Sequence, residues 1–343
     1  MRAVAAMLGV ACLAGCATTS TGLPPVPVYA SGETAPVGTV NDDAADDAAI
    51  WRNAADPADS LIVAPDKKAG LYVYGLDGEV RSFLDLGQVN NVDLVELPDG
   101  RVLVAASDRN DPLTAHIVTA LLDTATGELS LLRRFSVGAG EGYGFCMSLD
   151  AEREMVSYFS AVKEGAVYLT SQSLAAGLEG EASSTLLHTL PSQPEGCVYD
   201  DRTQRLYVGE EVGGIWVLDF ETDARQMLVP IDNRYLVADV EGLALAPEGE
   251  DGGYLVASSQ GDNAYAVYAL PSMEPVGRFA IVADEYGATE ETDGIALQLG
   301  NFGPQYPDGL FVAQDGINAP AAQNFKMVRW DEIRRVLGLF EAR

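Results

Sequence analysis

The sequence predicts an all-β protein, a six-bladed β-propeller, and three observations lead to this prediction. A polar or acidic residue, usually followed by a small one, precedes a short apolar strand six times, at spacings of 44, 52, 52, 46 and 52 residues. Each copy is followed by more short strands rich in β-branched and aromatic residues. Helical periodicity is confined to residues 331–343. A β-sandwich, the alternative, would not restart one pattern at this interval, whereas repeated units of several short strands are typical of propeller blades.

The first strand of each repeat starts at a residue that a propeller would place on one ring around its channel, because each blade is a rotated copy of the last. These residues are Asp47, Asn91, Tyr143, Glu195, Glu241 and Asp293. The carboxylates among them would repel one another and raise one another's pKa values once brought together. A bound cation relieves this repulsion, and Ca²⁺ suits carboxylate, carbonyl, phenol and water oxygens. The ring therefore predicts a calcium site.

The later strands of each repeat are expected in the same order along the chain. Second strands are expected at residues 61–64, 102–105, 155–158, 206–209, 254–257 and 310–313, and third strands include residues 70–74, 214–218 and 265–268. The loops after the second strands form a second predicted ring, and in repeats one to three these loops carry cations, namely Lys67, Lys68, Arg109 and Lys163. In a chain with only 21 Lys and Arg residues, cations beside an acidic ring suit phosphate, with metal on one side and bases on the other.

Charge and histidine content exclude several classes of function. The chain has 51 acidic and 21 basic residues, a net charge of −30, so nucleic acid would be repelled over most of the surface and is not an expected partner. The two histidines, His116 and His188, are too few for a His-rich zinc or di-iron site or for a histidine-phosphatase mechanism. Metals with oxygen ligands are therefore favoured.

The N-terminus predicts export. Residues 3–13 are an apolar run too short for a permanent transmembrane helix, and residues 13–16, Leu-Ala-Gly-Cys, resemble a bacterial lipobox in which Cys16 is lipidated. An ordinary cleaved signal is the alternative. We expect a signal peptide at residues 1–15, a flexible tether at residues 16–35 and the propeller at residues 36–343. The protein would then be an outer-membrane lipoprotein, or a periplasmic or extracellular protein, and a monomer.

Two cysteines remain for the predicted propeller. Cys146 and Cys197 each lie in an apolar, strand-like run, whereas Cys12 and Cys16 belong to the predicted signal. The pair either forms a disulfide in an oxidising periplasm or stays as two buried free thiols, and the sequence leaves both open.

Short runs along the whole predicted domain resemble the β-propeller phytases, or 3-phytases, which are calcium-dependent phosphatases acting on myo-inositol hexakisphosphate. The matching runs are residues 46–51, 66–71, 89–93, 143–145, 163–165, 195–196, 209–211, 239–243, 257–262, 292–295 and 311–316. They extend in order from about Glu33 to Trp330. Individually the runs are short, but together they are highly specific.

The resemblance implies roles for individual residues. The calcium ligands of the family correspond to Glu33, Asp47, Tyr143, Glu195, Glu211, Asp239 and Glu241, to which the first ring adds Asp293. The phosphate-binding cations correspond to Lys67, Lys68, Arg109 and Lys163. Those expected to act in catalysis are Lys67, Arg109, Tyr143, Glu195, Glu211 and Glu241. A structural calcium ion is also expected near Asp315 and Asn318, but Ile317 stands where the family commonly has an acidic residue, which puts that site in question.

The predicted function is a calcium-dependent 3-phytase that hydrolyses phytate stepwise to lower inositol phosphates, using several Ca²⁺ ions and a calcium-activated water. Lys67 and Arg109 would neutralise charge on the scissile phosphate, and Lys68 and Lys163 would hold a neighbouring phosphate. Two alternatives are a calcium-dependent lactonase or phosphotriesterase on a similar propeller, and a non-enzymatic propeller that uses calcium structurally to bind a partner.

Overall fold

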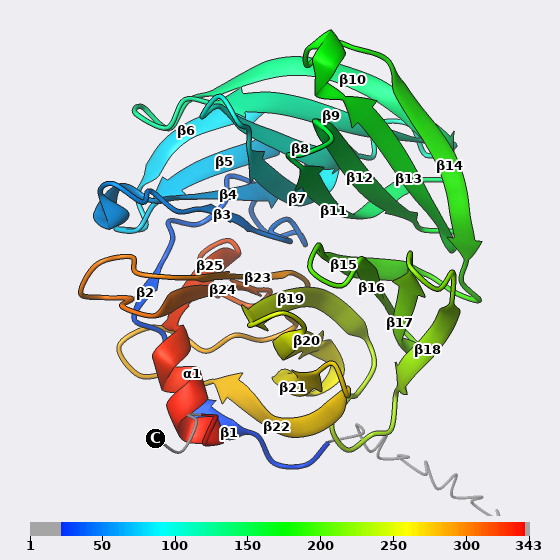
Figure 1. The fold of residues 1–343 in the computed structure, drawn as a ribbon. Coiled ribbons are helices and arrows are strands. Elements are labelled where there is room, and N and C mark those ends of the chain that lie inside the picture. The colour runs from blue at the N-terminus through cyan, green and yellow to red at the C-terminus, as the bar shows by residue number, and fades with distance from the viewer. Residues whose placement is uncertain (1–21, 340–343) are drawn as a thin grey trace, which may run out of the picture.

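The computed structural model describes residues 22–339 and is a six-bladed β-propeller (Figure 1). Six sheets follow one another along the chain, and the first strands of consecutive sheets contact each other around the whole ring. This confirms the predicted fold class. The predicted signal peptide, Cys12 and Cys16 lie outside the described residues.

Blades one to three are each four antiparallel strands that run outward from the channel in chain order. Blade one contains β3 (Ala49–Trp51), β4 (Leu61–Asp66), β5 (Gly70–Gly75) and β6 (Val80–Asp85). Blade two contains β7 (Val89–Glu96), β8 (Val102–Asp108), β9 (Thr114–Leu122) and β10 (Leu129–Ala139). Blade three contains β11 (Gly142–Asp150), β12 (Met155–Val162), β13 (Ala166–Ser173) and β14 (Ala182–Thr189).

Blades four to six repeat the pattern, and the last two also take in strands from the N-terminal segment. Blade four contains β15 (Pro194–Asp200), β16 (Arg205–Glu210), β17 (Gly214–Asp219) and β18 (Arg225–Pro230). Blade five contains β19 (Val240–Glu248), β20 (Gly252–Ser259), β21 (Ala264–Leu270), β22 (Glu274–Ile281) and β1 (Val26–Val28). Blade six contains β23 (Ile295–Leu299), β24 (Gly309–Asp315), β25 (Asn324–Arg329) and β2 (Gly32–Glu33).

The N-terminal segment closes the ring, which differs from the tether expected at residues 16–35. Strand β2 pairs antiparallel with β25 and supplies the outer strand of blade six, while β1 pairs parallel with β22 at the edge of blade five. Backbone pairing fixes these residues even though β1 and β2 are too short to show the alternation by which the longer strands were recognised. Residues 22–35 therefore belong to the propeller, and the expected tether is wrong for this part.

Burial explains why the repeats were visible in the sequence. The second strands β4, β8 and β24 are buried at every residue because neighbouring blades cover both faces, so they are largely apolar runs. The outer strand β6 alternates between exposed and half-buried residues. Among the described residues, each apolar cluster lies between two consecutive blades, including a cluster between blades six and one.

The small residue that follows most ring positions allows close packing of the inner strands. A Cβ at Gly196, directly after Glu195, would collide with the Glu241 carbonyl of the next blade, and a Cβ at Gly242 would collide with the backbone of β23. The small residue in the repeated polar-small-apolar pattern therefore marks where one blade contacts the next. It also means that consecutive ring residues lie side by side.

A repeated backbone hydrogen bond brings the second predicted ring beside the first. The residue after the second strand donates its N–H to a carbonyl just before the inner strand of the same blade, as in Lys67 to Ala44 (2.6 Å) and Arg109 to Gln88 (2.9 Å). The equivalent bonds are Lys163 to Glu141 (3.1 Å), Glu211 to Gln193 (3.0 Å) and Gln260 to Asp239 (3.0 Å). The loops of both rings therefore lie at one end of the channel.

A disulfide and one helix complete the fold. Cys146 on β11 and Cys197 on β15 form the disulfide, with Cα atoms 5.6 Å apart, so the pair joins blades three and four at the channel wall. Helix α1 (Trp330–Leu337) packs on β1 and β22 through buried Trp330 and Ile333. Within residues 22–339, no helix has the length and apolar character needed to cross a membrane.

We predict that Gly196→Ala destabilises the protein by about 2–3 kcal/mol, because the added methyl overpacks a backbone contact that neither blade can relax. Denaturant unfolding measures the loss. Gly287→Ala is the matched control, since its Cβ would meet only the Lys326 side chain at 3.5 Å, an ordinary contact. Equal unfolding midpoints for the two variants would show that close approach at Gly196 does not fix blade spacing.

Candidate active site

Three glutamates from two blades form an acidic cluster at the end of the channel where the inner strands begin. Carboxylate oxygens of Glu195, Glu211 and Glu241 all lie within 4.8 Å of one another. Glu195 is 3% and Glu241 4% exposed, whereas Glu211 is partly exposed. Glu195 and Glu241 start the inner strands β15 and β19, and Glu211 follows β16, so the two predicted rings meet here.

A buried lysine lies among three more carboxylates beside this cluster. The Lys67 ammonium is 2.7 Å from Asp293, 2.8 Å from Asp43 and 3.4 Å from Asp46. Burial lowers the pKa of Lys67, but the neighbouring carboxylates outweigh it and raise this pKa above its ordinary value. Lys67 therefore already neutralises part of the acidic ring, a role that the sequence analysis did not assign to it.

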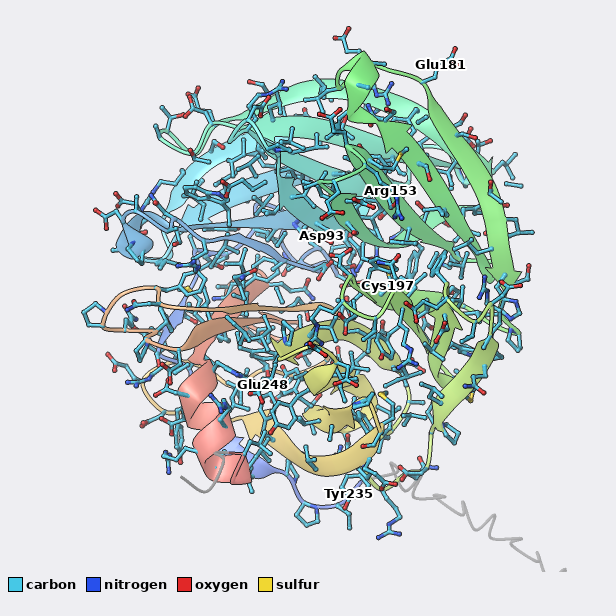
Figure 2. The ribbon with its side chains drawn as sticks, in the orientation of Figure 1. Asp93, Arg153, Glu181, Cys197, Tyr235 and Glu248 are labelled. Carbon is cyan, nitrogen blue, oxygen red and sulfur yellow. A yellow bond between two sulfur atoms is a disulfide. The ribbon has the colours of Figure 1, made fainter. Side chains whose placement is uncertain are left out.

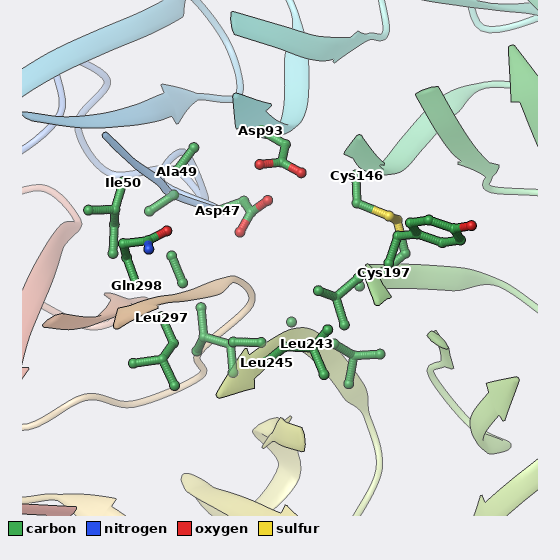
Figure 3. A pocket seen from close by; sticks show the side chains of 18 of the residues that line it. Asp47, Ala49, Ile50, Asp93, Cys146, Cys197, Leu243, Leu245, Leu297 and Gln298 are labelled. Carbon is green, nitrogen blue, oxygen red and sulfur yellow. A yellow bond between two sulfur atoms is a disulfide. The ribbon is translucent and has the colours of Figure 1, made fainter. Parts of the chain in front are cut away.

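Asp46 and Asp47 are adjacent in sequence but face different surroundings. Burial and the charges of Glu195 and Asp293 raise the pKa of Asp46 well above its ordinary value, although Lys67 opposes this. Asp47 instead lines a channel cavity of about 360 Å³ together with Asp93 (Figure 3). Asp46, which the sequence analysis did not single out, is thus the member of the pair beside Lys67.

The cavity continues the channel past the acidic cluster. Figure 3 shows the carboxylates of Asp47 and Asp93 near the Cys146–Cys197 disulfide and the side chain of Leu243, and Figure 2 places Asp93 and Cys197 toward the middle of the propeller. Burial is the main cause that raises the pKa of Asp47 to about 8 and that of Asp93 to about 6.

Arg109 is linked to the cluster through one asparagine. Its guanidinium donates to the side-chain oxygen of Asn90 at 2.6 Å, and the Asn90 amide donates to Glu195 at 2.9 Å. Glu141 accepts from Arg109 at 2.5 Å, and the guanidinium lies 4.8 Å from the centre of the Tyr143 ring. These contacts hold the Arg109 side chain beside the carboxylates.

The other predicted residues surround this centre at different depths. Burial, followed by Glu195 and Asp46, raises the pKa of Tyr143, so its hydroxyl stays protonated near the cluster. Lys163 is exposed, with its ammonium 5.3 Å from the centre of the aromatic ring of Tyr143.

Three more predicted residues lie around the cluster. Asp239 is half-buried, and its pKa is raised by burial and by Glu195. Lys68 is exposed and 3.6 Å from Asp42. Asn91, the ring residue of blade two, accepts from the Asn90 amide at 3.0 Å.

Glu33, Asp315 and Asn318 lie elsewhere, together in blade six around Lys326, which the sequence analysis did not consider. Asp43, Asn90 and Glu141 were also missed. Asp43 and Asn90 lie within or near matching runs, so proximity to those runs was the available signal. Nothing in the sequence marked Glu141 except that it lies two residues before the ring residue Tyr143.

The donor set of the central cluster fits a hard divalent metal ion. Both Asp46 carboxylate oxygens and Oε2 of Glu241 are buried without a hydrogen-bond partner. Burial and Glu195 raise the pKa of Glu241 well above its ordinary value, and burial and Glu195 raise that of Glu211 to about 7. These buried carboxyl groups are costly to ionise without a nearby positive charge, and a bound cation would supply that charge. All the donors are oxygens, as Ca²⁺ and Mg²⁺ prefer.

The protein is therefore a β-propeller whose channel end carries an acidic cluster that suits a metal ion, with lysine and arginine side chains beside it. A family model described as Phytase matches residues 2–341. The chain is also similar to the 3-phytase of Bacillus subtilis (strain 168), with 35% identity over 331 residues that cover 91% of this chain and 85% of that protein. The chain belongs to the phytase family.

We predict that the metal-free protein loses stability as pH rises from about 4 to 8. The folded-state pKa values of Asp47 (about 8), Glu211 (about 7) and Asp293 (about 6) lie above the ordinary range, so the folded state binds protons more tightly than the unfolded state. The stability gained from holding these carboxyl groups protonated is fully present below pH 4 and is lost as pH rises through their folded-state pKa values. Thermal unfolding in chelator at pH 5.5 and 8 measures it.

A divalent metal ion bound by the cluster should reverse this trend, since it would satisfy the ionised carboxylates and therefore stabilise the protein most at pH 8. Glu211→Gln removes one titrating group and should show a shallower fall in chelator. Stability that increases between pH 5.5 and 8 without metal would contradict the assigned burial of these charges.

Proposed function

We propose that the protein is a calcium-dependent 3-phytase, a phosphomonoesterase that removes phosphates stepwise from myo-inositol hexakisphosphate. Membership of the phytase family and the similarity to a 3-phytase support the reaction. The observation that carries the proposal is the cluster of Glu195, Glu211 and Glu241 beside the cations of the second ring. Oxygen-only donors favour Ca²⁺ as the metal.

Glu195, Glu211 and Glu241 would hold the metal. Asp46, Asp239 and Asp293 interact electrostatically with Glu195 and would contribute negative charge around it. When bound there, calcium would lower the pKa of a coordinated water and offset phosphate charge. Lys67, whose ammonium now pairs with Asp43, Asp46 and Asp293, would then be able to neutralise negative charge on an incoming phosphate.

Arg109 is positioned to stabilise charge on the scissile phosphate. Glu141, Asn90 and the Tyr143 ring orient its guanidinium before substrate arrives, so little reorganisation is needed in the transition state. Lys163 is exposed, with its ammonium 5.3 Å from the centre of the Tyr143 ring, where it would meet a second phosphate of the inositol. Lys68, exposed in the loop of blade one, would serve the same purpose.

Within residues 22–339, the cysteine and histidine nucleophiles that other phosphatase classes use are not placed for this reaction. Cys146 and Cys197 are joined in the disulfide, so neither offers a thiolate. His116 lies on β9 and His188 on β14, the third and fourth strands of their blades and away from the channel. Attack by water is therefore the favoured route.

Export is part of this proposal. The disulfide supports an oxidising compartment, because such bonds persist in the periplasm and outside the cell. We propose an exported monomer, held at the outer membrane if Cys16 is lipidated.

Phosphate release from phytate tests the proposed activity. We expect release in calcium and its loss in excess chelator, and we expect Glu241→Gln to reduce kcat by roughly 10²-fold or more. Glu181→Gln is the matched control, since Glu181 lies at the edge of the propeller (Figure 2). Full hydrolysis in chelator would contradict the proposal, as would an inactive calcium-loaded protein that hydrolyses lactones or phosphotriesters instead.

The two phosphate positions predict different kinetics for two variants. Arg109→Ala should lower kcat by roughly 10²-fold on phytate and on a simple monoester, because both develop charge at the scissile phosphate. Lys163→Ala should mainly raise KM for phytate, because its contact is made equally in the ground and transition states. Arg153→Ala is the control, since Arg153 is 78% exposed in the turn at the opposite end of β11. Equal effects of Lys163→Ala on both substrates, or none, would contradict two separate positions.

A further inference from the structure

The ammonium of Lys326 is enclosed by side-chain oxygens in blade six. The side chain is 0% exposed, and its Nζ lies 2.7 Å from Glu33 Oε2 and 3.0 Å from Asp315 Oδ2. It also donates to Oδ1 of Asn324 at 2.8 Å and to Oδ1 of Asn318 at 3.3 Å. A fully buried lysine with four oxygen partners is unusual, because an unpaired buried charge is costly.

Strand register brings these groups together from both ends of the chain. Lys326 on β25 pairs with Glu33 on β2 and with Ala313 on β24. Asn324 pairs with Asp315 at the end of the β24–β25 ladder. The contact between Glu33 and Lys326 therefore lies at the point where the N-terminal strand closes the last blade.

The polar groups around the ammonium are oriented as they would be around a metal ion. The Asn318 amide donates away from Lys326 to the Ala322 carbonyl at 2.8 Å, and that of Asn324 donates to the Thr34 carbonyl at 3.0 Å. Their amide oxygens are thereby turned toward the ammonium. The second oxygen of Asp315 accepts backbone N–H groups of Glu290 and Ile317, at 3.3 and 3.2 Å.

Three of the oxygen donors, from Glu33, Asp315 and Asn318, are residues from which the sequence analysis expected calcium ligands. A resident calcium ion does not fit here, because Lys326 Nζ already occupies the space at hydrogen-bond distance from them. Adding a divalent ion would bring two positive centres together in a buried site and leave the Lys326 charge without its carboxylates.

We propose that the ammonium of Lys326 is the built-in structural cation of blade six, standing where a metal ion would otherwise join β2 to the last blade. The closure of the propeller is then independent of calcium, and calcium acts only at the channel end. The proposal concerns the fold and does not depend on the substrate or on the reaction.

Replacing Lys326 with a short or a long neutral side chain tests whether its ammonium takes the place of a metal ion. Lys326→Ala empties the space among the oxygens, so the variant should bind about one more calcium ion per chain than the wild type. Lys326→Met fills the space without charge and should bind the wild-type number. Calcium content after equilibrium dialysis is the readout, measured by mass spectrometry of the metal.

Thermal unfolding adds a second readout. Both variants should unfold at lower temperature than the wild type in chelator, because Glu33 and Asp315 lose their counter-ion. Calcium should recover more of this loss in Lys326→Ala than in Lys326→Met. Equal calcium content in Lys326→Ala and wild type, with no such recovery, would overturn the proposal.

Variants of the acceptors keep the proposal testable if both lysine variants fail to fold. Glu33→Gln and Asp315→Asn in the wild-type background should leave the bound calcium number unchanged, because no metal sits there. Loss of about one calcium ion per chain in either variant would show that the wild-type site holds calcium and would overturn the proposal.

Discussion

The central constraint on this protein is that the ring brings acidic side chains together at one end of its channel. Close packing of inner strands, with glycine after Glu195 and after Glu241, leaves each ring residue beside its neighbour in the next blade. The fold cannot separate these charges without separating the blades. Lys67 offsets part of the repulsion through its ion pairs with Asp46 and Asp293, but both Asp46 carboxylate oxygens and one oxygen of Glu241 accept no hydrogen bond. A bound metal ion would complete the balance, and the cations at the rim would then face a site that is no longer strongly negative.

The repeat made the fold and most of the site predictable from the sequence. Each period of the polar-small-apolar pattern corresponds to one blade, so the pattern predicted both the number of blades and the convergence of Glu195 and Glu241. What it could not distinguish was which of two adjacent acids points to the cluster, since these acids precede the inner strand β3 (Ala49–Trp51) and their side-chain directions are set by tertiary contacts. Asp46 and Asp47 show this directly.

Features that depend on one long-range contact were not predictable in the same way. The strand Gly32–Glu33 is too short to carry a periodic signal and is held by pairing with β25, more than 290 residues later. Lys326 gave no signal, because a single lysine in a strand is ordinarily a surface residue. The disulfide was left open because the repeat puts Cys146 and Cys197 on consecutive inner strands but does not show whether their side chains face each other. For β2 and Lys326, the deciding contact joins segments that no repeat relates.

Two cations thus have different origins in this account: one supplied by the chain in blade six, and one taken from solution at the channel end. The most direct test is a crystal structure of the calcium-loaded protein with anomalous scattering recorded for calcium. The account predicts an anomalous peak bound by oxygens of Glu195, Glu211 and Glu241, at about 2.3–2.6 Å from each ligand. Absence of a peak at this cluster in crystals that contain calcium elsewhere on the protein would contradict it.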